Sequence, residues 1–279
     1  MAQVPLISLN DGSSIPQLGL GVWQVDPGIT ARVVRDAIDV GFRMIDTAEG
    51  YDNEAGVGEG IRTSGVPRDE LFITSKLRNG GHQRDAALKS FDATMKALRL
   101  EQLDMFLIHW PVPGQDQYVE AWQTLIELQQ EGRIKSIGVS NFNQDHLELI
   151  IAETGVAPVV NQIELHPYFT QADKREFLKS KDIHIESYSP LGSGAVLKDE
   201  TIKKIGAAKG KSIAQIIVRW HIQQGNIVIP KTTHADRMQE NFDVFDFELS
   251  ADEMQAITGL DKGEDGRTGS DPATNNDTF

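Results

Sequence analysis

The sequence contains no cysteine among its 279 residues. A disulfide framework, a thiol nucleophile and a thiolate metal site are therefore excluded, and cysteine usage does not identify the compartment. Basic residues are also scarce, since 27 Lys and Arg stand against 41 Asp and Glu and leave a formal net charge of -14. Binding along a phosphate backbone needs clustered positive charge, so we expect no nucleic-acid partner.

Long apolar runs are missing as well. No stretch approaches the roughly 20 apolar residues that a membrane-spanning helix requires, and MAQVPLISLNDGSS at the N-terminus lacks the basic and apolar regions of a signal peptide. We therefore predict no membrane partner and a cytoplasmic location. The seven histidines form neither an HExxH motif nor a histidine–carboxylate cluster, which predicts no metal site.

Short apolar runs alternate with helical segments along the whole chain. This alternation is typical of parallel strands joined by crossover helices, and eight such units fit a (β/α)8 TIM barrel, whose usual length is about 250 residues. We therefore predict an α/β fold with one domain spanning 1–279. The expected strands are 15–23, weakened by its glycines, and then 41–46, 71–76, 103–109, 134–140, 157–162, 183–188 and 226–231.

Other elements follow from local patterns. An apolar stripe predicts a helix over 118–131, and Ser212 is the expected N-cap of another helix that ends before Gly225. Residues 4–15 read as a small N-terminal β-hairpin that closes the floor of the barrel. The polar, glycine-rich segment 263–279 predicts an extended C-terminal tail over the surface.

Seven of the expected strands end in a residue whose side chain can form hydrogen bonds or exchange a proton. In a barrel these ends meet at one rim, where active sites of this fold lie. Polar strand ends are also common simply because loops are exposed, so the set is informative only as a whole. The seven residues are Asp46, Lys76, His109, Ser140, Gln162, Tyr188 and Lys231.

Four neighbouring groups on that rim suggest proton transfer. A free phenol has a pKa of about 10 and is a slow acid at neutral pH. If Lys76 lies beside Tyr51, its ammonium stabilises the phenolate and lowers the pKa of the phenol, while Asp46 keeps that ammonium charged. His109 is placed to hydrogen-bond a substrate carbonyl. The predicted catalytic set is Asp46, Tyr51, Lys76 and His109, and the reaction that suits it is carbonyl reduction or its reverse.

Reduction requires a source of hydride, which a chain without cysteine or evident metal ligands must take from a cofactor. A GxGxxG fingerprint is missing, so a Rossmann domain is not supported. The segment IPKTTHADRMQEN (229–241) offers another solution. Lys231, Thr232 and Arg237 supply charge and donors for an adenosine 2'-phosphate, and Glu240 and Asn241 supply partners for adenine. An exposed basic turn is the alternative reading of the segment.

The chain resembles the aldo-keto reductase family over essentially its whole length. Seven motifs carry the likeness in order: GFRMIDTAEGYDNE, LFITSKL, DMFLIHWP, IGVSNF, NQIELHP, SYSPLG and IPKTTHADRMQENFDVFDFELS. The short loops and the segment DGRTGSDP are most similar to the bacterial branch near the 2,5-diketo-D-gluconate reductases. The resemblance implies a monomeric barrel that binds NADPH and uses Tyr51 as the general acid.

The same resemblance implies roles for further residues. Ser140, Asn141 and Gln162 would hold the nicotinamide carboxamide, and Tyr188 would stack on its ring. The pyrophosphate path would include Ser189, Leu191 and Gly192. Many relatives carry Leu-Trp-Asn where this chain has Leu77, Arg78 and Asn79.

The substrate site is expected to include Trp23, Arg78 and Trp110. The tryptophans supply apolar walls. We expect Arg78 either to favour carbonyls with a carboxylate or many hydroxyls, or to point to solvent.

The sequence thus predicts an NADPH-dependent reductase of aldehydes, ketones, α-dicarbonyls or keto-sugars. Two alternatives stay open. One is a barrel that binds NADPH as a sensor or partner subunit without turnover. The other is a Schiff-base aldolase with Lys76 as nucleophile, although it leaves the segment from Lys231 to Asn241 unexplained.

Overall fold

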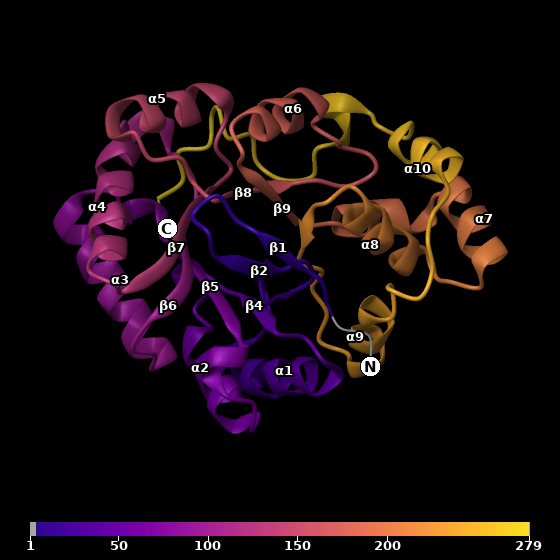
Figure 1. Cartoon of the computed structure of the whole chain (residues 1–279), viewed down its shortest axis with the longest axis horizontal. Coiled ribbons are helices and arrows are strands. Elements are labelled where there is room, and N and C mark those ends of the chain that lie inside the picture. The colour runs from indigo at the N-terminus through magenta and orange to yellow at the C-terminus, as the bar shows by residue number, and fades with distance from the viewer. Residues whose placement is uncertain (1–3, 279) are drawn as a thin grey trace.

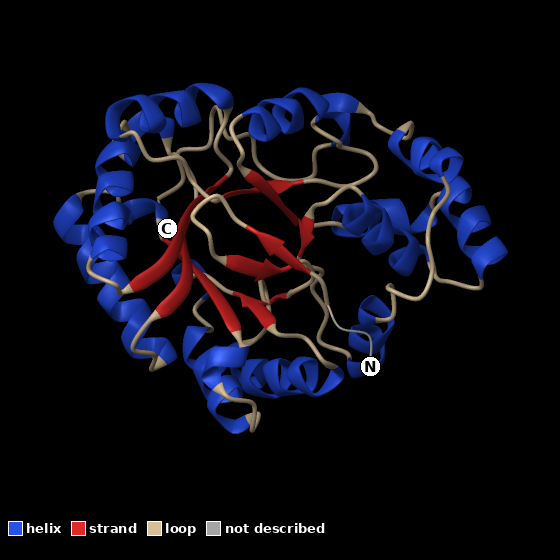
Figure 2. Cartoon of the chain, viewed as in Figure 1, coloured by secondary structure: helices blue, strands red, loops and turns tan. Residues whose placement is uncertain are grey.

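Eight parallel strands form a barrel in the computed structural model, which describes residues 4–278 (Figure 2). Neighbouring strands pair in chain order from β3 to β10. A parallel bridge joins Leu18 to Val228, and the Gly19 amide donates to the Val228 carbonyl at 3.0 Å, so the two sheet edges meet. The predicted TIM barrel is therefore confirmed. The strands are β3 (Leu20–Gly21), β4 (Met44–Asp46), β5 (Phe72–Leu77), β6 (Leu103–Ile108), β7 (Ile134–Ser140), β8 (Val160–Glu164), β9 (His184–Tyr188) and β10 (Ile227–Val228).

Helices surround the barrel and cover its outer face (Figure 1). Each predicted strand overlaps an observed one, but the ranges 15–23, 41–46 and 226–231 are longer than the observed strands, and the range 157–162 begins and ends too early. The start of the range 15–23 belongs instead to the hairpin strand Ser14–Pro16. The helices are α1 (Pro27–Val40), α2 (Glu54–Thr63), α3 (Arg84–Leu98), α4 (Tyr118–Gln130), α5 (Gln144–Thr154), α6 (Ala172–Ser180), α7 (Glu200–Lys209), α8 (Ile213–Gln223), α9 (Ala235–Phe242) and α10 (Ala251–Thr258).

Both helix predictions are confirmed. On α4, Trp122 and Leu125 are fully buried, as the apolar stripe requires. Ser212 caps α8 in a reciprocal pair with Gln215: the Ser212 hydroxyl accepts from the Gln215 amide at 3.2 Å, and the Gln215 side chain accepts from the Ser212 amide at 3.0 Å. Such a pair satisfies two backbone donors that a helix leaves open at its start.

Strand residues pack in two directions. Outward side chains form the large core between strands and helices, whereas inward ones such as Met44, Met105 and Leu107 form a separate cluster inside the barrel. Strands buried on both faces read as continuous apolar runs, which explains the pattern in the sequence. Polar side chains that point inward, such as that of Lys76, are also buried inside the barrel.

The N-terminal hairpin closes one end of the barrel. Strands β1 (Leu6–Ser8) and β2 (Ser14–Pro16) pair antiparallel, and Ile15 is fully buried in the inner cluster. The Ser13 and Ser136 hydroxyls lie 2.9 Å apart, and the Asn10 amide donates to the Pro158 carbonyl at 3.1 Å. In Figure 1 the hairpin lies in front of the strands. The predicted floor is confirmed.

The C-terminal segment lies on the surface as predicted, since most of residues 267–278 are exposed and form no regular helix or strand. It follows a short 3-10 helix (Gly263–Gly266) and crosses the rim opposite the hairpin, where Thr268, Gly269 and Asp277 line a cavity. The Asn79 side-chain amide donates to the Asp277 carbonyl at 2.7 Å. The polar composition thus predicts the exposure of the tail but not the rim residues that bind it.

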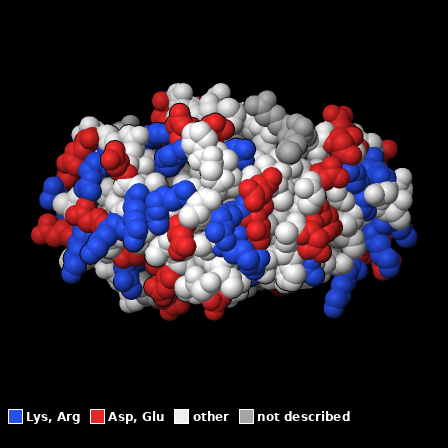
Figure 3. Space-filling model, turned by 90° about the horizontal axis from the view of Figure 1, so that it is seen from below, with Lys and Arg blue, Asp and Glu red and all other residues white. Residues whose placement is uncertain are grey.

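The surface carries interspersed charges. From below, Lys and Arg alternate with Asp and Glu despite the net charge of -14 (Figure 3). The pair between Arg32 and Asp36 is typical: its atoms are 2.8 Å apart, but the arginine side chain is 48% exposed. Such pairs contribute little to stability. Within residues 4–278, no helix combines the length and apolar character needed to cross a membrane.

The close packing of α2, which follows the Tyr51 loop, generates a stability prediction. A Cβ added at Gly58 would lie 2.2 Å from the Leu98 carbonyl oxygen. Gly58→Ala should therefore destabilise the protein by roughly 1–3 kcal/mol, although alanine is the better helix former. Thermal unfolding checks this, with Ala93→Gly at an exposed position of α3 showing the size of helix propensity alone. A melting temperature of Gly58→Ala at or above that of the unchanged protein would contradict the packing described.

Candidate active site

A cavity of about 490 Å³ opens at the carboxyl ends of the strands. This is the rim predicted from the strand-end residues, and the strands converge on it because they are parallel. The predicted site residues that line the cavity are Trp23, Asp46, Tyr51, His109, Trp110, Ser140, Asn141, Gln162, Tyr188, Ser189 and Lys231. Lys76 lies beneath it. The predicted residues outside the lining are Arg78, Leu191, Gly192, Thr232, Arg237, Glu240 and Asn241.

Lys76 is the centre of the cavity floor. Its side chain points inward from β5 and is fully buried, which is costly for an ammonium unless every donor is used. The ammonium donates to Asp46 Oδ1 at 2.7 Å, to the Thr47 carbonyl at 2.8 Å and to Tyr51 Oη at 3.3 Å. All three N–H groups therefore have an acceptor.

The surroundings of Lys76 hold its charge. Burial alone would lower the pKa of Lys76, but the charge of Asp46, followed by Tyr51, raises that pKa above its ordinary value. The group is an ammonium at neutral pH. It therefore has no free electron pair with which to attack a carbonyl, and its burial keeps it out of the cavity. These facts argue against the Schiff-base alternative.

The pKa of Tyr51 moves in the direction opposite to the sequence-based expectation. Burial raises the pKa of the phenol, and the charge of Lys76 offsets that effect only in part, so the net shift is upward. Tyr51 consequently keeps its proton at neutral pH. Because its oxygen accepts a hydrogen bond from Lys76, its own O–H is left to point into the cavity.

His109 lies beside the phenol as a neutral imidazole. The two rings meet edge to face, with centroids 5.6 Å apart. Burial, followed by the charge of Lys76, holds the pKa of His109 well below its usual value. A neutral ring can donate one hydrogen bond to a carbonyl oxygen without adding a second positive charge to the site.

A chain of amide and hydroxyl groups forms one wall of the cavity. The Ser140 hydroxyl donates to the Gln162 carbonyl at 3.0 Å, and the Asn141 amide donates to the His109 carbonyl at 3.1 Å. Tyr188 donates its hydroxyl proton to Asn141 Oδ1 at 2.9 Å, which fixes the tilt of its ring against the cavity. The wall is thus rigid and offers both a flat aromatic face and amide groups.

The segment after β10 forms the mouth of the cavity. Lys231 is exposed at its edge, and the Thr232 hydroxyl accepts from the His234 amide at 3.2 Å just before α9 begins. The N-cap residue of α9, His234, makes no capping hydrogen bond with its side chain. Arg237 is exposed on the same helix, whereas Asn241 is buried. Two cations beside open backbone donors suit a phosphate group.

The predicted substrate residues divide into two groups. Trp23 and Trp110 line the cavity, and Trp23 is 52% exposed. Arg78 lies outside the lining with a side chain that is 48% exposed, and its guanidinium is 3.9 Å from Glu49 Oε1. The alternative in which Arg78 points to solvent therefore describes this structure.

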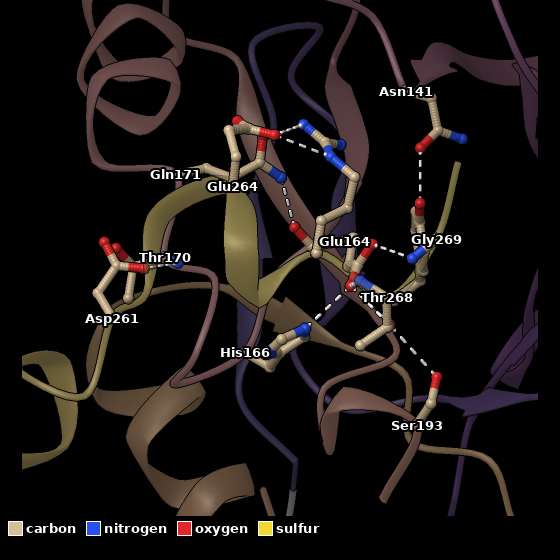
Figure 4. A network of polar contacts seen from close by, with 12 residues as sticks. Asn141, Glu164, His166, Thr170, Gln171, Ser193, Asp261, Glu264, Thr268 and Gly269 are labelled. Carbon is tan, nitrogen blue, oxygen red and sulfur yellow. Dashed lines mark hydrogen bonds and ion pairs between the residues drawn. The ribbon is translucent and has the colours of Figure 1, made fainter. Parts of the chain in front are cut away.

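Glu164, which the sequence reasoning missed, anchors the tail at the rim. One oxygen accepts from the Thr268 amide and hydroxyl, each at 2.7 Å, and the other from the Gly269 amide at 2.9 Å (Figure 4). His166 Nε2 lies 2.9 Å from the same carboxylate. Burial would raise the pKa of Glu164, but these hydrogen bonds lower it to about 2.

This anchor brings unpredicted residues into the cavity. Thr268, Gly269, Ser270, Asn275 and Asp277 all line it, although they lie more than 100 residues along the chain from Glu164. The available signal was the charged residue in NQIELHP, whose place two positions after Gln162 puts both side chains on the inner face of β8.

Comparisons with known proteins agree with this geometry. An aldo-keto reductase from Mycolicibacterium smegmatis is 48% identical over 274 residues, which cover 98% of this chain and 99% of that protein. Methylglyoxal reductase DkgA of Escherichia coli is 48% identical over 276 residues and 98% of both chains. A mutant of Gox0644, crystallised in complex with NADPH, superimposes with a TM-score of 0.95 at 49% identity and covers 98% of this chain and 99% of that one.

The model of the aldo/keto reductase family matches residues 16–262. That range includes every predicted catalytic residue and the whole barrel. The two similar sequences named above cover nearly all of this chain in turn. The predicted membership is confirmed: this chain belongs to the aldo/keto reductase family of oxidoreductases.

Proposed function

We propose that the protein reduces the carbonyl group of small aldehydes and α-dicarbonyls with NADPH, and that Tyr51 is the general acid. The observation that carries this proposal is the fully buried ammonium of Lys76, held by Asp46 and donating to the oxygen of Tyr51. A phenol in this position keeps its proton until a base forms beside it, and the ammonium then stabilises the phenolate.

The residues divide the work of the reduction. When bound, NADPH supplies the hydride that the carbonyl carbon accepts. His109 donates a hydrogen bond to the carbonyl oxygen and orients it. Tyr51 transfers its proton to that oxygen as negative charge develops there, which gives an alcohol and a phenolate. Lys76 stabilises the phenolate until solvent returns the proton, and Asp46 keeps Lys76 charged throughout.

The cavity fits this cofactor. Ser140, Asn141 and Gln162 present amide and hydroxyl groups on one wall, and the Tyr188 ring offers a stacking face. At the mouth, Lys231 and Arg237 flank the start of α9 and would hold a phosphate on the adenosine. Glu240 and Asn241 follow on the same helix, within reach of an adenine bound there.

The proposed substrate class rests on the other residues that line the cavity. Trp23 and Trp110 are apolar, whereas Asn275 and Asp277 of the tail are polar, so a small molecule with adjacent polar groups is favoured. The relatives named methylglyoxal reductase act on an α-dicarbonyl, which supports testing that class first. Ketones and keto-sugars belong in the same comparison.

One chain supplies every group that this reaction needs. We therefore propose that the protein acts as a monomer, as the sequence predicts. The cytoplasmic location stays a prediction.

Removing the proposed acid should abolish reduction. Tyr51→Phe should lower kcat by about 10²- to 10⁴-fold, which is the usual contribution of general acid catalysis, and it should leave NADPH affinity nearly unchanged. NADPH oxidation is followed across aldehydes, α-dicarbonyls, keto-sugars and keto-acids, with Tyr118→Phe as a control that removes a phenol hydroxyl elsewhere. Retention of most activity in Tyr51→Phe would refute the acid role. NADPH binding without turnover on any substrate would instead favour the sensor alternative.

The phosphate contacts should distinguish the two nicotinamide cofactors. Lys231→Ala with Arg237→Ala should weaken NADPH binding by about 10-fold or more and leave NADH binding little changed, because only NADPH carries the 2'-phosphate. Fluorescence titration measures both affinities. Lys204→Ala with Arg32→Ala removes the same charges from exposed positions elsewhere. Equal losses for NADPH and NADH would show that the first pair does not read the 2'-phosphate.

Loosening the tail should affect substrate binding more than chemistry. Glu164→Gln replaces the carboxylate that accepts from the Thr268 and Gly269 backbone amides with an amide group that also donates. The hydrogens of these backbone amides should therefore exchange with solvent about 10-fold or more faster, and KM should rise more than kcat falls. Glu101→Gln is the control at an exposed position away from the tail. Unchanged amide exchange would show that Glu164 does not anchor the tail.

The same carboxylate should make the stability of the protein fall in acid. Its folded pKa of about 2 lies below the ordinary 4.5, so its stabilisation is present above pH 4.5 and is lost as the pH falls toward 2. Acid unfolding of Glu164→Gln should show a weaker loss over that range than the unchanged protein.

A further inference from the structure

A second inward-pointing carboxyl group lies beneath the cavity. Glu186 is on β9, two residues before Tyr188, and its side chain is fully buried inside the barrel. Neither of its oxygens has a hydrogen bond of ordinary geometry to any of the residues that the structure describes. A carboxyl in such surroundings is costly when charged. Neither the proposed mechanism nor the family resemblance gives it a role.

Strand register places Glu186 beside the proton-donor system. Gln162 of β8 is its direct partner in the parallel ladder, so the two side chains point the same way. The Gln162 amide donates to Asp46 Oδ2 at 2.9 Å, and Asp46 Oδ1 accepts from Lys76. The neighbour on the other side is Ile227, which is apolar. Glu186 thus lies beside Gln162, the first member of a hydrogen-bonded row that leads to Tyr51.

Charges in this row act on one another through a dry interior. Burial, followed by the charge of Asp46, raises the pKa of Glu186 to about 8, although Lys76 and the neighbouring Gln162 amide work in the opposite direction. The carboxyl is therefore mostly neutral at neutral pH. An ionised Glu186 would raise the pKa of Tyr51 further. The groups that face it are Asp46, Lys76 and Tyr51, from β4, β5 and the loop after β4.

We propose that Glu186 is a positioning residue for proton transfer, and that reduction depends on its carboxyl being protonated so that Lys76 balances Asp46 alone. This inference rests on the proposed role of Tyr51. When Glu186 is neutral, the full field of the ammonium acts on the phenolate as it forms. When Glu186 ionises, a second negative charge shares that ammonium, and Tyr51 becomes a weaker acid.

The consequence is a step in the pH profile. The rate of hydride transfer in the reduction direction should fall roughly three- to tenfold as Glu186 ionises, before Tyr51 itself loses its proton at higher pH. The direction follows from the roles: the donor must release a proton, and added negative charge opposes that release. Glu186→Gln, which has a similar shape and no charge, should lack the first step and keep the second.

The experiment measures single-turnover hydride transfer from NADPH to methylglyoxal at a series of pH values. Glu54→Gln is the matched control, because Glu54 is also buried, its pKa is also raised by burial, and its Oε1 accepts from Ser75 rather than facing Gln162. We expect Glu54→Gln to keep both steps. A first step that persists in Glu186→Gln, or that disappears equally in Glu54→Gln, would overturn the proposal.

Infrared spectroscopy of the unchanged protein gives a second reading that does not require Glu186→Gln to fold. A protonated carboxyl should lose its carbonyl band over the same pH range as the kinetic step. If the first kinetic step occurs and no carboxyl carbonyl band is lost over the same pH range, the proposal is overturned. Turnover with an unaltered profile in Glu186→Gln would defeat this inference alone, whereas absence of turnover in the unchanged protein would defeat the proposed function as well.

Discussion

The buried ion pair between Lys76 and Asp46 is the interaction on which the site depends. An ammonium with no exposure is tolerated only because its three donors meet Asp46, Thr47 and Tyr51. Losing one partner of such a pair leaves an uncompensated buried charge, which costs about 3–5 kcal/mol. The end of β4 and the loop carrying Tyr51 are therefore held against β5 by the same contacts that prepare the phenol for proton transfer.

The barrel makes those contacts strong by separating them from water. Below the polar layer, inward side chains such as Met44, Met105 and Ile227 form an apolar cluster, and Ile15 of the hairpin closes it. Charges above this cluster interact through a medium less polar than water, so each affects its neighbours more than it would at a surface. The floor that the hairpin provides is thus part of the electrostatics of the site and not only of its stability.

The alternation of apolar runs with helical segments predicts the barrel. The residues at the ends of these runs predict its rim, because the carboxyl ends of parallel strands lie at the same end of a barrel. Other features depend on partners that are distant in the chain. The tail was predicted as a surface segment because its composition is polar, and only the position of Glu164 shows that its amides are bound. The sequence places Arg78 on a loop, but it does not predict its ion pair with Glu49. In the sequence, Glu186 is the charged residue of the apolar run 183–188, and nothing in that pattern indicates its ladder neighbour Gln162.

The pKa of Tyr51 shows why chemical type alone is insufficient. Proximity to Lys76 correctly predicted the sign of one contribution, yet burial outweighs it and the net shift is upward. The two contributions have different consequences. Burial destabilises the phenolate and so keeps the proton on the resting group, whereas the ammonium stabilises the phenolate as it forms during reduction. A site with both can hold its acid protonated at neutral pH and still stabilise its conjugate base when the proton is transferred.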